Sequence, residues 1–218
     1  MIRLSLLILI VFILYSCKSK VEVVLTKYTN GEIHELLILD KPITKDSLGI
    51  KKVFFETGKL QCSGPVSNNK RNGLWTCYYP NDSIEWRATY KMELEDGEVF
   101  YRYPNGAWRK TTIVKGAKNG KTSEYNYDST SKEHFYIYGQ YANNLEQGLW
   151  TKTDTNGVLL IEMTFIKGER IGYFSNRYKN GQIRIKGELQ KDSSVQNFTF
   201  YDETGNKATK DSYVINRI

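Results

Sequence analysis

Two interleaved series of turn residues constrain this chain of 218 residues more than any other feature, because both repeat with a period near 24. The first series recurs at intervals of 24, 24, 51, 24 and 24 residues, at Gly58, Asp82, Gly106, Gly157, Gly181 and Gly205. The interval of 51 is two periods plus a little, with the missing turn near residues 129–132. The second series recurs at intervals of 23 to 28 residues, at Gly73, Gly97, Gly120, Gly148 and Gly172. Two turn series that share one period predict a β-hairpin repeated about six times.

The two series predict different turns. Asn-Gly between apolar residues favours a two-residue turn in most units of the first series, which would set Tyr79 opposite Ile84. Pro80 favours a three-residue loop instead, which would break that pairing. The second series predicts wider, six-residue loops that set Val66 opposite Trp75, with equivalent pairs in the later units.

Alternation along the predicted strands gives one apolar and one polar face. The apolar face includes Cys62, Val66, Trp75, Cys77, Ala88, Tyr90, Val99, Trp108, Met163, Phe165, Phe174, Ile185 and Phe200. We expect register slips near residues 110–113 and 125–138. An apolar face of this length needs cover, so the sheet curls over it, takes residues 21–39 as a cap, or pairs with a partner. The predicted fold is all-β: a single curled antiparallel hairpin meander with one apolar face.

The N-terminus predicts export and lipid attachment. Arg3 precedes an apolar run over residues 4–14, too short to span a bilayer and typical of a signal peptide. The segment ending at Cys17 resembles the lipobox of bacterial lipoproteins, which implies cleavage after residue 16 and diacylation of Cys17. Lys18 is not the Asp that, in such lipoproteins, is associated with inner-membrane retention. We therefore expect a cell-envelope protein, anchored in the outer membrane and facing the periplasm. An ordinary signal peptide with a coincidental Cys is the alternative.

The predicted domains are the signal peptide (1–16), a tether with capping strands (17–52), the repeats (53–207) and a C-terminal tail (208–218). Lys and Arg exceed Asp and Glu by 31 to 24, but the two signs are interleaved rather than gathered in the one-signed stripe of a nucleic-acid site. His34 and His134 each have a Glu neighbour, yet adjacent strand residues point to opposite faces. We expect no enzyme, no cofactor and no metal.

Cys62 and Cys77 both fall on the apolar face. The six-residue loop places them diagonally, about 7–8 Å apart between Cα atoms, which favours two buried thiols over a disulfide. A slip of two residues would bring them together.

The polar face offers the candidate binding residues. Exposed aromatic and basic side chains there are expected to contact a partner protein, or alternatively a glycan or anionic lipid; they are Tyr78, Arg87, Phe100, Arg102, Tyr173, Arg177 and Tyr201.

The repeat unit resembles the MORN repeat, most closely the bacterial variant in proteins often labelled antitoxin-like. The resemblance rests on residues 72–82 (NGLWTCYYPND), 147–150 (QGLW) and 168–173 (GERIGY), and it extends over residues 53–207. It implies antiparallel hairpins in an extended meander with roles in protein–protein contact or, in some eukaryotic relatives, membrane-lipid contact. An antitoxin role conflicts with the export signal. The expected function is therefore a lipid-anchored binding or scaffolding module for an envelope protein.

Replacing Cys17 tests the predicted lipid attachment and membrane location. The Cys17→Ser variant is expected to lose lipid attachment and to leave the membrane fraction, because two or three acyl chains are needed for stable anchoring. Membrane fractionation with intact-mass measurement checks both results. A variant that still fractionates with membranes at full length would contradict the lipoprotein prediction.

Overall fold

The computed structural model describes residues 20–40, 48–191 and 195–209. The signal peptide and Cys17 lie outside the described residues. The described part of the chain contains strands and turns and no helix. The strands are β1 (Val21–Lys27), β2 (Ile33–Leu39), β3 (Leu48–Phe54), β4 (Leu60–Ser67), β5 (Lys70–Arg71), β6 (Gly73–Tyr78), β7 (Ile84–Lys91), β8 (Leu94–Arg102), β9 (Trp108–Val114), β10 (Ala117–Asp128), β11 (Glu133–Ala142), β12 (Leu145–Glu146), β13 (Gly148–Asp154), β14 (Leu159–Ile166), β15 (Glu169–Arg177), β16 (Ile183–Leu189), β17 (Val195–Tyr201) and β18 (Lys207–Ala208).

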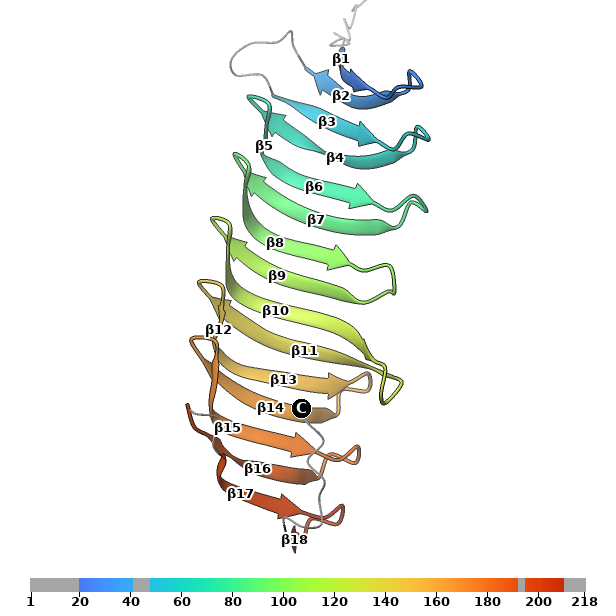
Figure 1. The fold of residues 1–218 in the computed structure, drawn as a ribbon. Helices are drawn as coiled ribbons and strands as arrows, with labels where there is room; N and C mark the ends of the chain where they lie inside the picture. The colour runs from blue at the N-terminus through green and yellow to red at the C-terminus, as the bar shows by residue number, and fades with distance from the viewer. Residues whose placement is uncertain (1–19, 41–47, 192–194, 210–218) are drawn as a thin grey trace, which may run out of the picture.

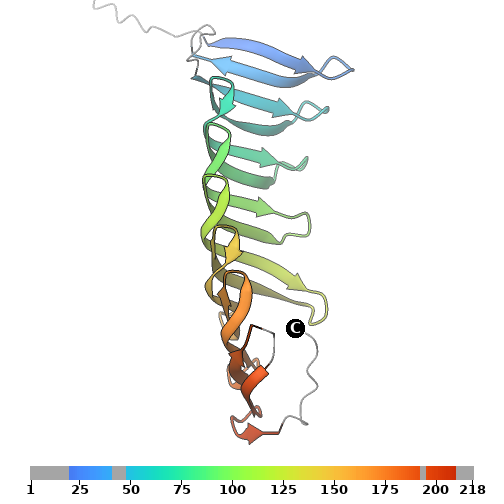
Figure 2. The same cartoon turned by 60° about the vertical axis from the view of Figure 1, so that its left-hand side comes forward.

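All the strands form one antiparallel sheet in which each main strand pairs with the next along the chain. The short strands β5 and β12 continue β6 and β13 beside β4 and β11. Figure 1 shows the hairpins stacked in sequence order from β1 to β18, and Figure 2 shows the strands bending near their β5 and β12 ends. The predicted all-β curled meander is confirmed.

The turns of the first series are three-residue loops, so the predicted two-residue turn is wrong. The Tyr79 amide donates to the Ser83 carbonyl over 2.8 Å, and the Asp82 amide donates back to the Tyr79 carbonyl over 2.9 Å. Asp82 has φ of 65°, and a glycine takes this left-handed position in the equivalent turns. In three turns of the series the preceding residue is an Asn that accepts a hydrogen bond from the amide two residues on: Asn81 from Ser83, Asn105 from Ala107 and Asn180 from Gln182. The three-residue loop that Pro80 favoured is therefore the form that all the turns of the first series adopt.

The two-residue turns occur instead at the tips of the second series, where six-residue loops were predicted. Both central residues have positive φ in five turns: Asn68-Asn69, Met92-Glu93, Lys115-Gly116, Asn143-Asn144 and Lys167-Gly168. The second-series glycines follow these tips inside the strands, also with positive φ, at irregularities in the pairing. The tighter tips shift the predicted pairs by two residues, so that Val99 lies opposite Ala88 and Phe174 opposite Met163. A shift of two preserves the face of every side chain.

The prediction of two free thiols is wrong for the same reason. Cys62 lies directly opposite Cys77 in the β4–β6 ladder, with the Cα atoms 4.1 Å apart, and the two form a disulfide. The same shift sets Gly64 against Trp75, where a Cβ atom would overlap the indole ring. Gly139 and Gly187 stand in the same relation to Trp150 and Phe198, so the bare backbone of one strand makes room for the aromatic ring of the next.

The apolar face holds the core, as predicted, in two clusters. Leu37, Leu39, Val66, Trp75, Ala88 and Tyr90 form the first, and Met163, Phe174, Ile185 and Phe200 form the second. Leu37 and Leu39 belong to β2, so the strands of residues 21–39 extend the sheet at its end while contributing to its core. The turn between these strands, at residues 28–31 (YTNG), has the same three-residue form as the turns of the later repeats. It therefore adds Gly31 to the first series, whose predicted members begin at Gly58.

Tyrosines at the first position of these turns link one hairpin to the next. The hydroxyl of Tyr28 donates to the Phe54 carbonyl over 2.8 Å, and that of Tyr79 donates to the Arg102 carbonyl over 2.7 Å. Tyr178 donates likewise to the Tyr201 carbonyl over 2.9 Å. The turn side of the sheet is thus bonded between repeats by side chains as well as by strand pairing.

The disulfide is expected to stabilise the sheet. Cys62→Ala/Cys77→Ala removes a crosslink of sequence separation 15, which should lower the free energy of unfolding by about 3 kcal/mol. Urea unfolding of the full chain, with and without reductant, measures the change. The variant serves as its own control because reductant should not affect it. Equal stability of the oxidised and reduced wild type would contradict the assignment.

Candidate binding face

Trp108 lies on the polar face, so the prediction that it belongs to the apolar face is wrong. In most hairpins an extra residue is accommodated after the three-residue turn; Cys77 pairs with Trp86 while Tyr78 pairs with Ile84. The β8–β9 hairpin lacks this irregularity, and Arg102 pairs directly with Trp108. The cause is visible in the sequence as the one interval of 23 between Gly97 and Gly120. The predicted slip near residues 110–113 thus falls a few residues earlier.

Because the β8–β9 hairpin lacks the extra residue, Trp108 lies among other aromatic rings on the polar face of β8–β11. Trp108 lies 6.2 Å from Phe100, 6.3 Å from Tyr125 and 6.3 Å from Tyr136 between ring centroids. Tyr125 and Tyr136, directly opposite in the β10–β11 ladder, are 5.1 Å apart. Contacts between rings extend this aromatic cluster to His134, Tyr127 and Tyr138. Only the interval of 23 signals the cluster in the sequence.

Three of the predicted binding residues come together at the edge of this cluster. The guanidinium carbons of Arg87 and Arg102 lie 5.5 Å and 5.8 Å from the centre of the Phe100 ring. Both arginines are exposed, and neither forms an ion pair with a described residue. We call Arg87, Phe100, Arg102 and Trp108 the arginine–aromatic patch.

The other predicted residues lie elsewhere. Tyr78 is half-buried at the end of β6, opposite Ile84. Tyr173 is exposed on β15, six strand spacings or roughly 29 Å from β8. Arg177 is held by Glu162 over 3.1 Å, and the Lys186 ammonium lies 5.5 Å from the Tyr201 ring. The structure therefore divides the predicted residues between separate regions.

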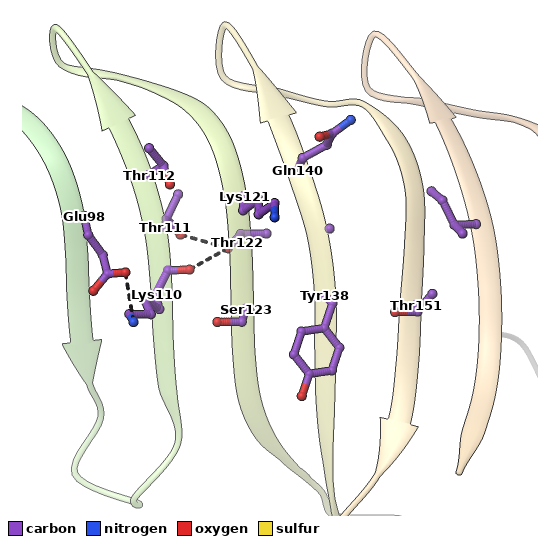
Figure 3. Close-up of a pocket in the computed structure, with 12 residues that line it drawn as sticks. Glu98, Lys110, Thr111, Thr112, Lys121, Thr122, Ser123, Tyr138, Gln140 and Thr151 are labelled. Carbon is purple, nitrogen blue, oxygen red and sulfur yellow. Dashed lines mark hydrogen bonds and ion pairs between the residues drawn. The ribbon is translucent and has the colours of Figure 1, made fainter. Parts of the chain in front are cut away.

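An open depression of about 470 Å³ lies beside the aromatic cluster, toward the two-residue turns (Figure 3). Its polar-face lining forms two rows across β8–β13: Lys110, Ser123, Tyr138 and Thr151 in one, and Glu98, Thr112, Lys121, Gln140 and Leu149 in the other. Thr111, Thr122 and Gly139 complete the lining. The sequence predicts a binding role for none of these residues.

The opposite face carries a polar group behind the depression. Thr111 and Thr122 are buried and hydrogen-bonded to each other over 2.9 Å. Next to them Arg109 lies 2.7 Å from the nearly buried carboxylate of Glu124. Burial lowers the pKa of Arg109, but the hydrogen bond and charge of Glu124 outweigh it, and the net pKa is raised. Arg109 therefore stays charged, and the Arg109–Glu124 pair interrupts the apolar face between the two core clusters.

Neither His34 nor His134 lies in a group of side chains that could bind a metal ion. His34 contacts the Thr26 hydroxyl over 3.1 Å, and His134 stacks on Tyr125 at 4.9 Å. Among the residues that the structure describes, no three His, Cys, Asp or Glu side chains lie together as a metal site would require. The same described residues contain no helix that is long and apolar enough to cross a membrane.

Comparison with known proteins gives a family match for one hairpin, which contains Arg87 of the patch. Residues 71–92 match the family model described as the MORN repeat variant. They comprise the end of β5, β6, the three-residue turn, β7 and the first residue of the next tip, which is one structural repeat. No curated protein matches the chain. The match supports a MORN-repeat protein and, with it, a repeat-based binding or scaffold module.

Proposed function

We propose that this protein is a lipid-anchored module of the bacterial cell envelope that binds an envelope protein through the arginine–aromatic patch. The observation that carries the proposal is the pair of exposed arginines on the Phe100 ring beside Trp108. Trp, Tyr and Arg supply most of the binding energy at protein interfaces. Two guanidinium groups without a described carboxylate partner favour a partner that presents Asp or Glu.

The rigidity of the surrounding sheet supports this role. The patch lies across β7–β9, whose hairpins are joined by continuous ladders and by the Tyr79 hydroxyl bonded to the Arg102 carbonyl. Side chains held on paired strands need little ordering on association, which lowers the entropic cost of binding.

The envelope location rests on the sequence of the N-terminus, with separate support from the disulfide. Cys62–Cys77 joins two strands of the core, and structural disulfides persist in oxidising compartments outside the cytoplasm. The proposal places the domain on the periplasmic side of the outer membrane, tethered through Cys17, with a non-catalytic role.

Crosslinking in intact cells tests the proposal. Arg87→Ala/Arg102→Ala is expected to reduce recovery of one envelope protein at least tenfold, because each hot-spot residue contributes about tenfold or more to affinity. Tyr173→Ala is the matched control, since it removes an exposed aromatic side chain from the same face roughly 29 Å away.

Quantitative affinity purification after crosslinking measures recovery. The same protein recovered at equal yield from the double variant would contradict the patch. Recovery of no envelope protein from the wild type would contradict the protein-binding function.

A further inference from the structure

The depression beside the aromatic cluster is a second candidate site, distinct from the arginine–aromatic patch. Its two rows of side chains lie on the same face as the patch but toward the two-residue turns, and they extend across β8–β13. Those strands cover four spacings, roughly 19 Å. The volume of about 470 Å³ falls within the range of small-molecule sites.

The lining is rich in groups that both donate and accept hydrogen bonds. Thr112, Ser123 and Thr151 present hydroxyls, and Gln140 presents an amide, as Figure 3 shows for these side chains. None of the four side chains hydrogen-bonds to another described residue. Their hydrogen-bonding capacity is therefore open to a ligand.

The charge of the depression is nearly balanced. Lys110 and Glu98 form an ion pair of 2.9 Å, which leaves Lys121 as the one lining cation without an ion-pair partner among the described residues. A site for a multiply charged anion would instead gather several cations or arginine forks. The depression is also open rather than enclosed, so it would leave a hydrophobic ligand largely in contact with water.

Tyr138 supplies a flat apolar surface at the edge of the depression next to the aromatic cluster. Its side chain is 44% exposed and lies opposite Ser123 on one side and Thr151 on the other. An aromatic ring flanked by hydroxyls suits a sugar, because one face of a pyranose presents C–H groups while its edges present hydroxyls.

We propose that the depression on β8–β13 binds a saccharide unit of an envelope polysaccharide, stacked on Tyr138 and hydrogen-bonded by Ser123, Thr151 and Gln140. The site is open at its ends, so the ligand is a unit within a chain rather than an enclosed monosaccharide. An extended peptide is the competing ligand, and the test below distinguishes it.

Calorimetric titration of the full chain tests this site, with the protein in a detergent that has no sugar headgroup. The probes are chito-oligosaccharides, malto-oligosaccharides and solubilised peptidoglycan glycan strands, with a mixed pool of unstructured peptides in parallel. At least one saccharide probe is expected to bind. Ser123→Ala and Thr151→Val should each weaken binding about fivefold, as expected for the loss of one hydrogen bond. Tyr138→Ala should weaken it tenfold or more, since stacking and cover are lost together.

Two matched controls lie on the same strands outside the depression. Tyr127→Ala removes an equally exposed tyrosine from β10, and Thr153→Val removes a hydroxyl from β13; both should leave the affinity within about twofold, as expected for surface positions away from the site. Failure of every saccharide to bind, equal losses in the control variants, or binding of the peptides alone would overturn the proposal. Arg87→Ala/Arg102→Ala should bind saccharide normally, so failure of the protein-binding patch and failure of this site are separable.

Discussion

The structure depends on a backbone feature that recurs once in each repeat, the glycine with positive φ a few residues after a two-residue turn. Gly73, Gly97, Gly120, Gly148 and Gly172 all have φ between 72° and 136°. In each case the nearest side chain is that of the residue eight positions earlier, from Pro65 beside Gly73 to Thr164 beside Gly172. This arrangement lets a tight turn lead into a long ladder, and the ladder sets which side chains meet. The disulfide and the aromatic rings over glycines both follow from that register.

Periodicity in the sequence was enough to predict the architecture. The 24-residue interval and the alternation of apolar and polar residues predict a one-sided hairpin meander, and the buried positions of Trp75, Ala88 and Phe174 confirm the apolar face. The turn assignments were wrong in both series, yet the face assignments of the core residues were right, with Trp108 as an exception. A pairing error of two residues leaves every side chain on its own side of the sheet. An error in turn geometry therefore changes the predicted partner of a residue more readily than the face on which its side chain lies.

Local sequence patterns do not determine which residues lie opposite one another on neighbouring strands. Asn-Gly is compatible with both a two-residue turn and a three-residue loop, and only the hydrogen bonds of the folded chain separate them. The Cys62–Cys77 pair was misplaced by two residues for a separate reason, because the sequence predicted a six-residue loop where the chain makes a two-residue turn at Asn68-Asn69. Trp108 was misplaced for a different reason, because a single absent residue in the β8–β9 hairpin turns its side chain to the other face. The interval of 23 recorded that absence, but its structural consequence depends on which strand loses the residue.

The candidate surfaces arise where the repeat is least regular. In β9 and β10 the apolar face carries Thr111, Thr122 and the Arg109–Glu124 pair, while the polar face carries the aromatic cluster. The exchange of character between faces gives the middle of the sheet an exposed aromatic surface that its ends lack. A photo-crosslinking amino acid placed singly at positions on both faces of β7–β13, in intact cells, tests most directly whether this surface is where binding occurs. Capture of ligand from polar-face positions such as 87, 110 and 138, and not from apolar-face positions such as 88, 111 and 137, is the predicted result. Capture from the apolar-face positions alone would contradict it.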